Sequence, residues 1–185
     1  MADTLTPPTQ VIYSSLDKTH LFFVQPSTFE KGKQMQPCFG TLFRIEREKV
    51  AGFVSPKYVP VWTANLENAL SPKGVLVAND GIFVVTVNDY SANTNEKTAI
   101  VIYNKQGKQN AALSLIDIFT HEALAKIPES TSSFLWFFGG TIDSTTKTLE
   151  LTVWDSGTLE KPNFRKISID LETGKLVNNI FLHEE

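Results

Sequence analysis

The sequence predicts an all-β fold, and two observations carry this prediction. Along the 185 residues, short apolar segments alternate with turn-forming residues, and stretches suited to helix are scarce. The segment 82–87, Ile-Phe-Val-Val-Thr-Val, is apolar on both of the faces that a strand would present, whereas a strand with one solvated face alternates apolar and polar residues. Such a strand belongs in the middle of a sheet that is covered on both sides.

An internal repeat indicates how the strands are grouped. The segment "IYNKQGK" at 102–108 recurs as "IDLETGK" at 169–175, at a constant offset of 67 positions. Each segment predicts a strand, a tight turn with glycine at a positive φ, and a return strand. A weaker copy with shorter spacing precedes both. The chain is therefore expected to contain three related units.

Each copy is expected to form a four-stranded antiparallel meander, and a long polar loop joins its second and third strands. This is how the blades of a β-propeller are built. The prediction is a flexible N-terminal segment, 1–10, followed by a single β-rich domain, 11–185, with one short helix over 116–127. The three blade-like repeats are expected over 11–54, 74–115 and 133–182.

Three blades form half a propeller and leave two ends. If the two ends stay open, they expose apolar sheet faces, and such faces mark either a protein interface or an aggregation-prone surface. The preferred solution is a two-fold homodimer that closes a six-bladed ring. The alternative is a curved stack of three sheets whose ends are capped by 59–70 and by the 116–127 segment.

Composition excludes some classes of partner. The formal net charge is -3, and the 17 Lys and Arg residues are scattered rather than clustered. This argues against nucleic-acid binding, which requires clustered positive charge. No apolar segment approaches the about 20 residues of a membrane-spanning helix, so no membrane insertion is expected. The single cysteine, Cys38, can form no internal disulfide.

Several motifs together resemble a known group. The segments "ANDGIFVVTVNDY", "IVIYNKQGK", "ALSLIDI", "IPESTSSFLW" and "ISIDLETGKLV" are similar to those of an uncharacterised bacterial protein family of unknown function, over roughly 75–177. The chain departs from the group at Tyr103-Asn104, where Tyr-Asp is more usual. The resemblance implies a propeller-like β-rich fold and assigns no activity. Members often carry a signal peptide, so it favours a periplasmic or secreted location over a cytoplasmic one, although residues 1–10 do not form such a signal.

One loop is rich in oxygen ligands. The stretch 88–97 contains Asp89, Asn93, Asn95 and Glu96, the residue types that bind calcium. The register of a calcium-binding loop is missing, so a solvated loop is the preferred interpretation and calcium the alternative. No metal site is expected from the three histidines, because none has the spacing of metal ligands.

Aromatic residues offer a second candidate for ligand binding. Trp136 and Trp154 lie in apolar segments and are predicted to be core residues, whereas Trp62 lies in an expected linker and is the candidate for an exposed, ligand-stacking ring.

The function predicted from these features is that of a non-enzymatic, propeller-like binding protein that self-associates or binds an unknown protein partner. The alternative is a small glycan-directed hydrolase or lyase whose loop carboxylates form a site in a channel. No catalytic residue is identified by the sequence.

Overall fold

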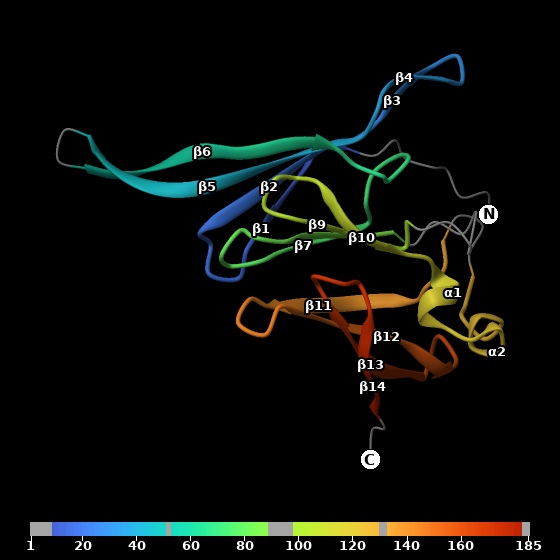
Figure 1. Ribbon diagram of the computed structural model, residues 1–185. Helices are drawn as coiled ribbons and strands as arrows, with labels where there is room; N and C mark the ends of the chain where they lie inside the picture. The colour runs from blue at the N-terminus through green and yellow to red at the C-terminus, as the bar shows by residue number, and fades with distance from the viewer. Residues whose placement is uncertain (1–8, 51–52, 89–97, 130–132, 183–185) are drawn as a thin grey trace.

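The computed structural model describes residues 9–50, 53–88, 98–129 and 133–182. Its architecture is mostly β, as predicted, with antiparallel pairing throughout the described strands. Three of the sheets have four strands each, and Figure 1 shows them one below the other, with the β5–β6 ribbon (Phe39–Val50 and Phe53–Asn65) and the β3–β4 hairpin (Thr28–Glu30 and Lys33–Gln36) standing out from them. The asparagine-rich loop and residues 1–8 of the expected N-terminal segment lie outside the described residues.

Sheet 1 contains the N-terminal strands in the order β1-β2-β5-β6. Its members are β1 (Val11–Ser14), β2 (His20–Gln25), β5 (Phe39–Val50) and β6 (Phe53–Asn65). The first repeat was expected to end at 54, and 59–70 was the cap of the alternative stack; the fourth strand of sheet 1 instead begins at Phe53 and extends to Asn65. The strand contains Pro56 and Pro60, and an edge strand tolerates proline wherever its N–H would point away from the neighbouring strand.

A fourth sheet, not predicted, lies within the loop between β2 and β5. It is the two-stranded hairpin of β3 (Thr28–Glu30) and β4 (Lys33–Gln36). Gly32 has φ +78°, which allows the tight turn between the two strands. The side chains of both strands are exposed, so the hairpin adds no residues to the core.

Sheet 2 and sheet 3 repeat the same four-stranded order. Sheet 2 consists of β7 (Gly74–Val77), β8 (Val84–Val87), β9 (Ile100–Tyr103) and β10 (Gln109–Leu113). Sheet 3 consists of β11 (Phe137–Asp143), β12 (Thr148–Gly157), β13 (Pro162–Asp170) and β14 (Leu176–Leu182). The repeat identified in the sequence therefore corresponds to equivalent strands of two sheets.

The single helix expected over 116–127 is instead two short helices, α1 (Leu115–Ile118) and α2 (His121–Leu124). Phe119 between them is extended, with φ −122° and ψ 146°. The hydroxyl of Thr120 accepts a hydrogen bond from the Ala123 N–H at 3.2 Å and so starts a new helix. None of the described helices is long and apolar enough to cross a membrane.

Sheet 2 lies between the other two sheets and is buried on both faces. Every residue of β8 and β9 is buried. Val85, Ile100 and Ile102 pack in one core with residues of sheet 3, whereas Val84 and Val101 pack in a second core with residues of sheet 1. This explains why 82–87 lacks alternation: each of its two faces meets a different sheet.

The first turn of each of the three four-stranded sheets is closed by an aspartate. Asp17, Asp80 and Asp143 each accept a hydrogen bond from the backbone N–H two residues later, at 3.1, 2.9 and 2.8 Å. These carboxylates are therefore committed to turn geometry.

Candidate interaction surface

Sheet 1 presents apolar side chains on both faces. On β2, Phe22 and Val24 point inward and are fully buried, while Leu21 and Phe23 point outward and are half-buried. The outward face is therefore apolar where a solvated sheet carries polar residues. Nothing else in the described part of the chain covers these side chains completely.

A groove of about 530 Å³ lies on this outer face. Its lining comes from all four strands of sheet 1: Ile12, Leu21, Phe23, Phe43 and Tyr58. Strand register explains why they converge, because Ile12 pairs with Phe23 and Leu21 pairs with Phe43 on the same face. Ile12 is 63% exposed and Tyr58 is 54% exposed. Large apolar side chains gathered in this way mark a binding surface.

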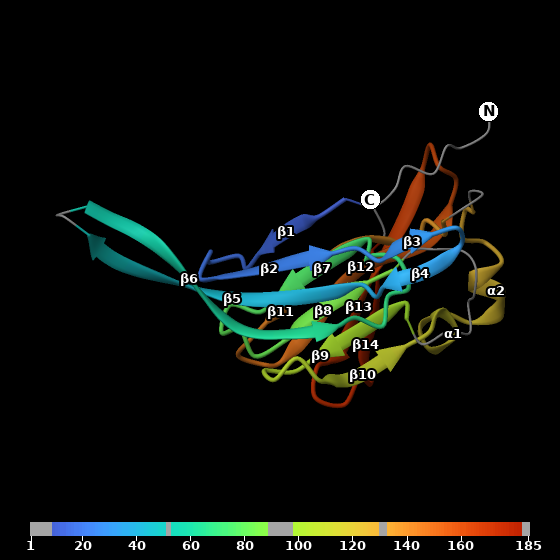
Figure 2. The same ribbon diagram turned by 90° about the horizontal axis from the view of Figure 1, so that it is seen from above.

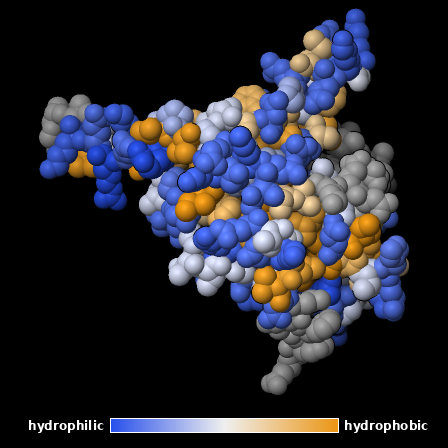
Figure 3. Space-filling model, in the orientation of Figure 1, coloured by the Kyte–Doolittle hydropathy of each residue, from blue (hydrophilic) through white to orange (hydrophobic). Residues whose placement is uncertain are grey.

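The β5–β6 ribbon extends this surface away from the body. Figure 1 shows the ribbon projecting far beyond the other strands, and Figure 3 shows it standing clear of the body, with hydrophobic residues where it leaves the body. Seen from above, in Figure 2, the ribbon lies on the side opposite to the helices. No sheet of the described chain packs against its outer half.

The two faces of the ribbon differ in chemistry. One face carries two ion pairs, Arg44 with Glu46 and Lys57 with Glu48. Strand alternation places Ile45, Tyr58 and Val54 on the other face, continuous with the apolar groove. Val54 and Tyr58 are exposed there. Arg47 and Lys49 have the same strand phase as Ile45, so this face is apolar with positive charge near its end.

The outer face of sheet 3 is of the opposite kind. Its strands alternate cleanly: Leu149, Leu151, Ile167 and Ile169 are fully buried, and the residues between them are not. Most of the outward residues are polar: Thr141, Glu150, Thr152, Lys166, Ser168 and Asn178. Toward the turn between β12 and β13 the same face carries Phe164 and Phe138, whose ring centroids are 4.6 Å apart. The outer face of sheet 3 is thus mainly polar with one aromatic cluster, whereas the groove on sheet 1 is lined by apolar side chains and Tyr58.

Trp62, the aromatic residue expected to reach solvent, is buried. It is 8% exposed and packs between Phe22 and Tyr103, with ring centroids 5.4 and 6.3 Å away. It lies on the inward face of β6, which the sequence had assigned to a linker. Trp136 and Trp154 are buried, as predicted, whereas Phe138 is 47% exposed.

The remaining predicted ligand residues, Asp89, Asn93, Asn95 and Glu96, lie outside the described residues. Among the residues that are described, no group of three or more His, Cys, Asp or Glu side chains could hold a metal ion. The buried His20 is engaged structurally, because its Nδ1 lies 3.0 Å from the Asn79 carbonyl of sheet 2.

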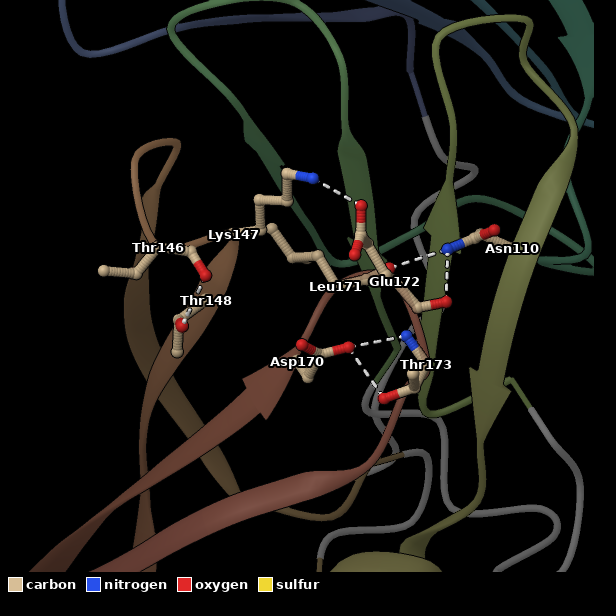
Figure 4. Close-up of polar contacts among 8 residues, drawn as sticks. All are labelled: Asn110, Thr146, Lys147, Thr148, Asp170, Leu171, Glu172 and Thr173. Atoms are coloured by element: carbon tan, nitrogen blue, oxygen red, sulfur yellow. Dashed lines mark hydrogen bonds and ion pairs between the residues drawn. The ribbon is translucent and has the colours of Figure 1, made fainter.

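A polar hollow of about 420 Å³ lies between the hairpin turns of sheets 2 and 3. Figure 4 shows that the polar groups beside it are paired with one another. Lys147 Nζ donates to Glu172 at 2.5 Å, and the Asn110 amide donates to the Leu171 and Glu172 carbonyls, both at 2.8 Å. The Asn110 contacts join the two sheets, and the polar groups drawn there hydrogen-bond to one another.

The carboxyl groups at these turns are held in the ionised form. Hydrogen bonds from the Thr173 hydroxyl and backbone N–H lower the pKa of Asp170, and the Thr145 N–H lowers the pKa of Asp143. The general acid of a glycoside hydrolase needs a raised pKa. These two carboxylates therefore suit turn closure better than acid catalysis.

The apolar outer face of sheet 1 was not predicted, although a sequence feature indicates it. The segment "HLFFV" has no polar residue after His20, so it is apolar on both faces in the same way as 82–87.

Comparisons with known proteins give no assignment that could replace this geometric argument. No protein-family model matches the chain, and no curated protein matches it significantly.

Proposed function

We propose that this protein is a non-enzymatic, propeller-like binding protein that self-associates through the outer face of sheet 1. The observation that carries the proposal is the groove lined by Ile12, Leu21, Phe23, Phe43 and Tyr58. Burial of such side chains is favourable by about 25 cal/mol per Å² of apolar surface. A polar ligand would gain little from a surface that offers almost no hydrogen-bonding side chains.

Two relationships support the propeller-like arrangement. The first strands of the sheets adjoin, since β7 contacts both β1 and β11, as the innermost strands of successive blades do. Equivalent turn glycines also pack on the preceding sheet: Gly107 lies against Trp62 of sheet 1, and Gly174 lies against Ala111 of sheet 2. The packing of sheet 2 on sheet 1 is thus similar to the packing of sheet 3 on sheet 2.

Membership of the bacterial group and a location outside the cytoplasm remain predictions from the resemblance. Calcium binding by the 88–97 loop likewise stays a prediction, tested by calorimetric titration of the protein with calcium.

Solution mass tests the proposal. Light scattering coupled to size exclusion, over about 1 to 200 µM protein, is expected to give a mass near twice 20.6 kDa at the upper concentrations. The variant Phe23→Glu places a charge in the groove and is expected to run at 20.6 kDa throughout. Thr152→Glu, on the polar face of sheet 3, is the matched control and keeps the wild-type mass.

Circular dichroism and urea unfolding establish that Phe23→Glu is folded. A wild-type protein that stays at 20.6 kDa at every concentration overturns self-association. A dimer that is unaffected by Phe23→Glu overturns the assignment of the surface.

A further inference from the structure

We infer that two copies associate face to face through sheet 1, crossed so that the β5–β6 ribbon of each lies over the far end of the other's sheet, with Arg47 beside Glu67 of the second copy. The inference rests on the self-association proposed above and specifies its geometry. Four features of the chain lead to it: a blunted edge, unequal ends, the sign of the charges on the ribbon, and strand register.

The edge of sheet 1 is unsuited to strand addition. β6 is the outermost strand and is paired only with β5. Pro56 and Pro60 lie in the same strand phase and have no N–H to donate, and proline on an edge strand is a common way to prevent edge-to-edge pairing. An incoming chain is therefore not expected to pair with β6, and the apolar face of the sheet is the surface that it contacts.

The outer faces of sheets 1 and 3 differ in polarity, and this difference determines which surface the outer face of sheet 1 contacts in a dimer. Closing a six-bladed ring would place the apolar face of sheet 1 on the outer face of sheet 3, where Glu150 and Lys166 are exposed. Burying those charges without partners is costly. A two-fold axis instead sets the same apolar patch against itself, which is self-complementary. Sheet 1 against sheet 1 is the arrangement that leaves the polar end in water.

The charges on the ribbon decide the orientation of the two copies. A face-to-face pair can have its two-fold axis along the strands or across them. With the axis along the strands, Arg47 and Lys49 of one copy lie over the same residues of the other, and like charges repel. With the axis across the strands, each ribbon points toward the opposite end of its partner's sheet.

Strand register then selects the residue that Arg47 meets. The Phe43 side chain is central to the groove, and on β5 Arg47 lies four residues to one side of it and Phe39 four residues to the other. At about 3.3 Å per residue, an axis across the strands at Phe43 brings Arg47 over the level of Phe39, about 13 Å from the axis. Phe39 pairs with Asn65, and Glu67 follows with an exposed side chain.

A charge swap tests this geometry. Arg47→Glu and Glu67→Lys are each expected to weaken dimerisation about tenfold, since each change makes two repulsive pairs per dimer. The double variant Arg47→Glu/Glu67→Lys restores the pairs with reversed sign and is expected to return the dissociation constant to within about threefold of wild type. Lys166→Glu, on sheet 3, is the control and is expected to leave the dissociation constant unchanged. Sedimentation velocity over a dilution series supplies the constants.

Engineered cysteines give a second, independent measurement. Cys38 is buried, so an added cysteine is the exposed thiol of each variant. A mixture of Arg47→Cys and Glu67→Cys chains is expected to form a disulfide-linked pair under mild oxidation, whereas Arg47→Cys alone is not. Efficient cross-linking of Tyr58→Cys with Lys166→Cys would instead support ring closure and overturn the inference.

Different results would overturn self-association itself and the crossed orientation of the two copies. A strictly monomeric wild type overturns the proposed self-association and this inference with it. A dimer that Phe23→Glu dissociates, but in which the charge swap gives no rescue and the Arg47 and Glu67 cysteines do not cross-link, keeps the surface and overturns the crossed orientation alone.

Discussion

Gly107 lies directly against the indole of Trp62: a Cβ at position 107 would be 2.6 Å from Cε3 of that ring. The glycine belongs to the last hairpin of sheet 2, and the tryptophan belongs to the outermost strand of sheet 1. The contact therefore sets how closely the two sheets approach. Gly107 also has φ +72°. Glycine is therefore favoured at this position for two reasons: the backbone conformation is one that other residues rarely adopt, and a side chain would clash with Trp62.

Gly107→Ala is accordingly expected to destabilise the fold by about 2–4 kcal/mol, the sum of a positive-φ penalty and overpacking against Trp62. The measurement is the free energy of unfolding from urea titration. Gly32→Ala is the matched control, because Gly32 has φ +78° but no atom within 4 Å of the added methyl, and it is expected to cost about 1 kcal/mol. Equal losses for the two variants would contradict a packing role for Gly107.

Substitutions on opposite faces of β9 are expected to be similarly costly, because each face lies in a different core. Ile100→Ala removes volume between sheets 2 and 3, and Val101→Ala removes volume between sheets 1 and 2. Each is expected to lower the free energy of unfolding by about 2 kcal/mol or more. Lys166→Ala on β13 should change it by no more than about 0.5 kcal/mol. A Val101→Ala variant as stable as this control would show that sheet 1 does not cover β9.

Stability is expected to fall at alkaline pH. Burial raises the pKa of the Cys38 thiol from 9.0 to about 11, and burial raises the pKa of the Tyr103 hydroxyl from 10.0 to about 12. Because both groups ionise at lower pH in the unfolded chain, the unfolded state binds fewer protons between about pH 9 and 12. The stability conferred by the neutral groups is complete below pH 9 and is lost as pH rises through that window.

Urea midpoints measured from pH 8 to 10.5 test this expectation. The wild-type midpoint should fall with pH, and Cys38→Ala should fall less steeply. Parallel curves for the two proteins would show that the thiol does not contribute.

Arg165 is expected to be replaceable by an apolar residue of similar length. It is 7% exposed, the only hydrogen bond that its side chain makes among the described residues is a 3.4 Å contact with the Ile118 carbonyl, and its Nε has no partner among them. The guanidinium lies 4.9 Å from the centroid of the Phe119 ring, and burial lowers the pKa of Arg165. A charge held in this way contributes little beyond the packing of its stem.

Arg165→Met should therefore change the free energy of unfolding by no more than about 1 kcal/mol, in either direction. Arg165→Ala should cost about 2 kcal/mol more, because it leaves a cavity. A large loss for both variants in urea titration would show that the charge itself is stabilising.

Local sequence features determined much of this fold because their causes are local. The hairpin glycines reflect backbone conformation within a few residues, and together with the 67-residue offset they located the last hairpins of sheets 2 and 3 directly. Double-sided apolar character likewise identified β8 as a strand covered on both faces. These signals were sufficient for the all-β class and for the meander order of sheets 2 and 3.

The tertiary structure alone decided the features that depend on neighbours distant in sequence. Trp62 was the candidate for an exposed ring in a linker, and only the pairing of β6 with β5 shows that it lies in a strand and is buried against sheet 2. The two open ends were expected to be alike. The outer face of sheet 3 is mainly polar and that of sheet 1 is mainly apolar, because strand pairing, and not order along the chain, determines which side chains share a face.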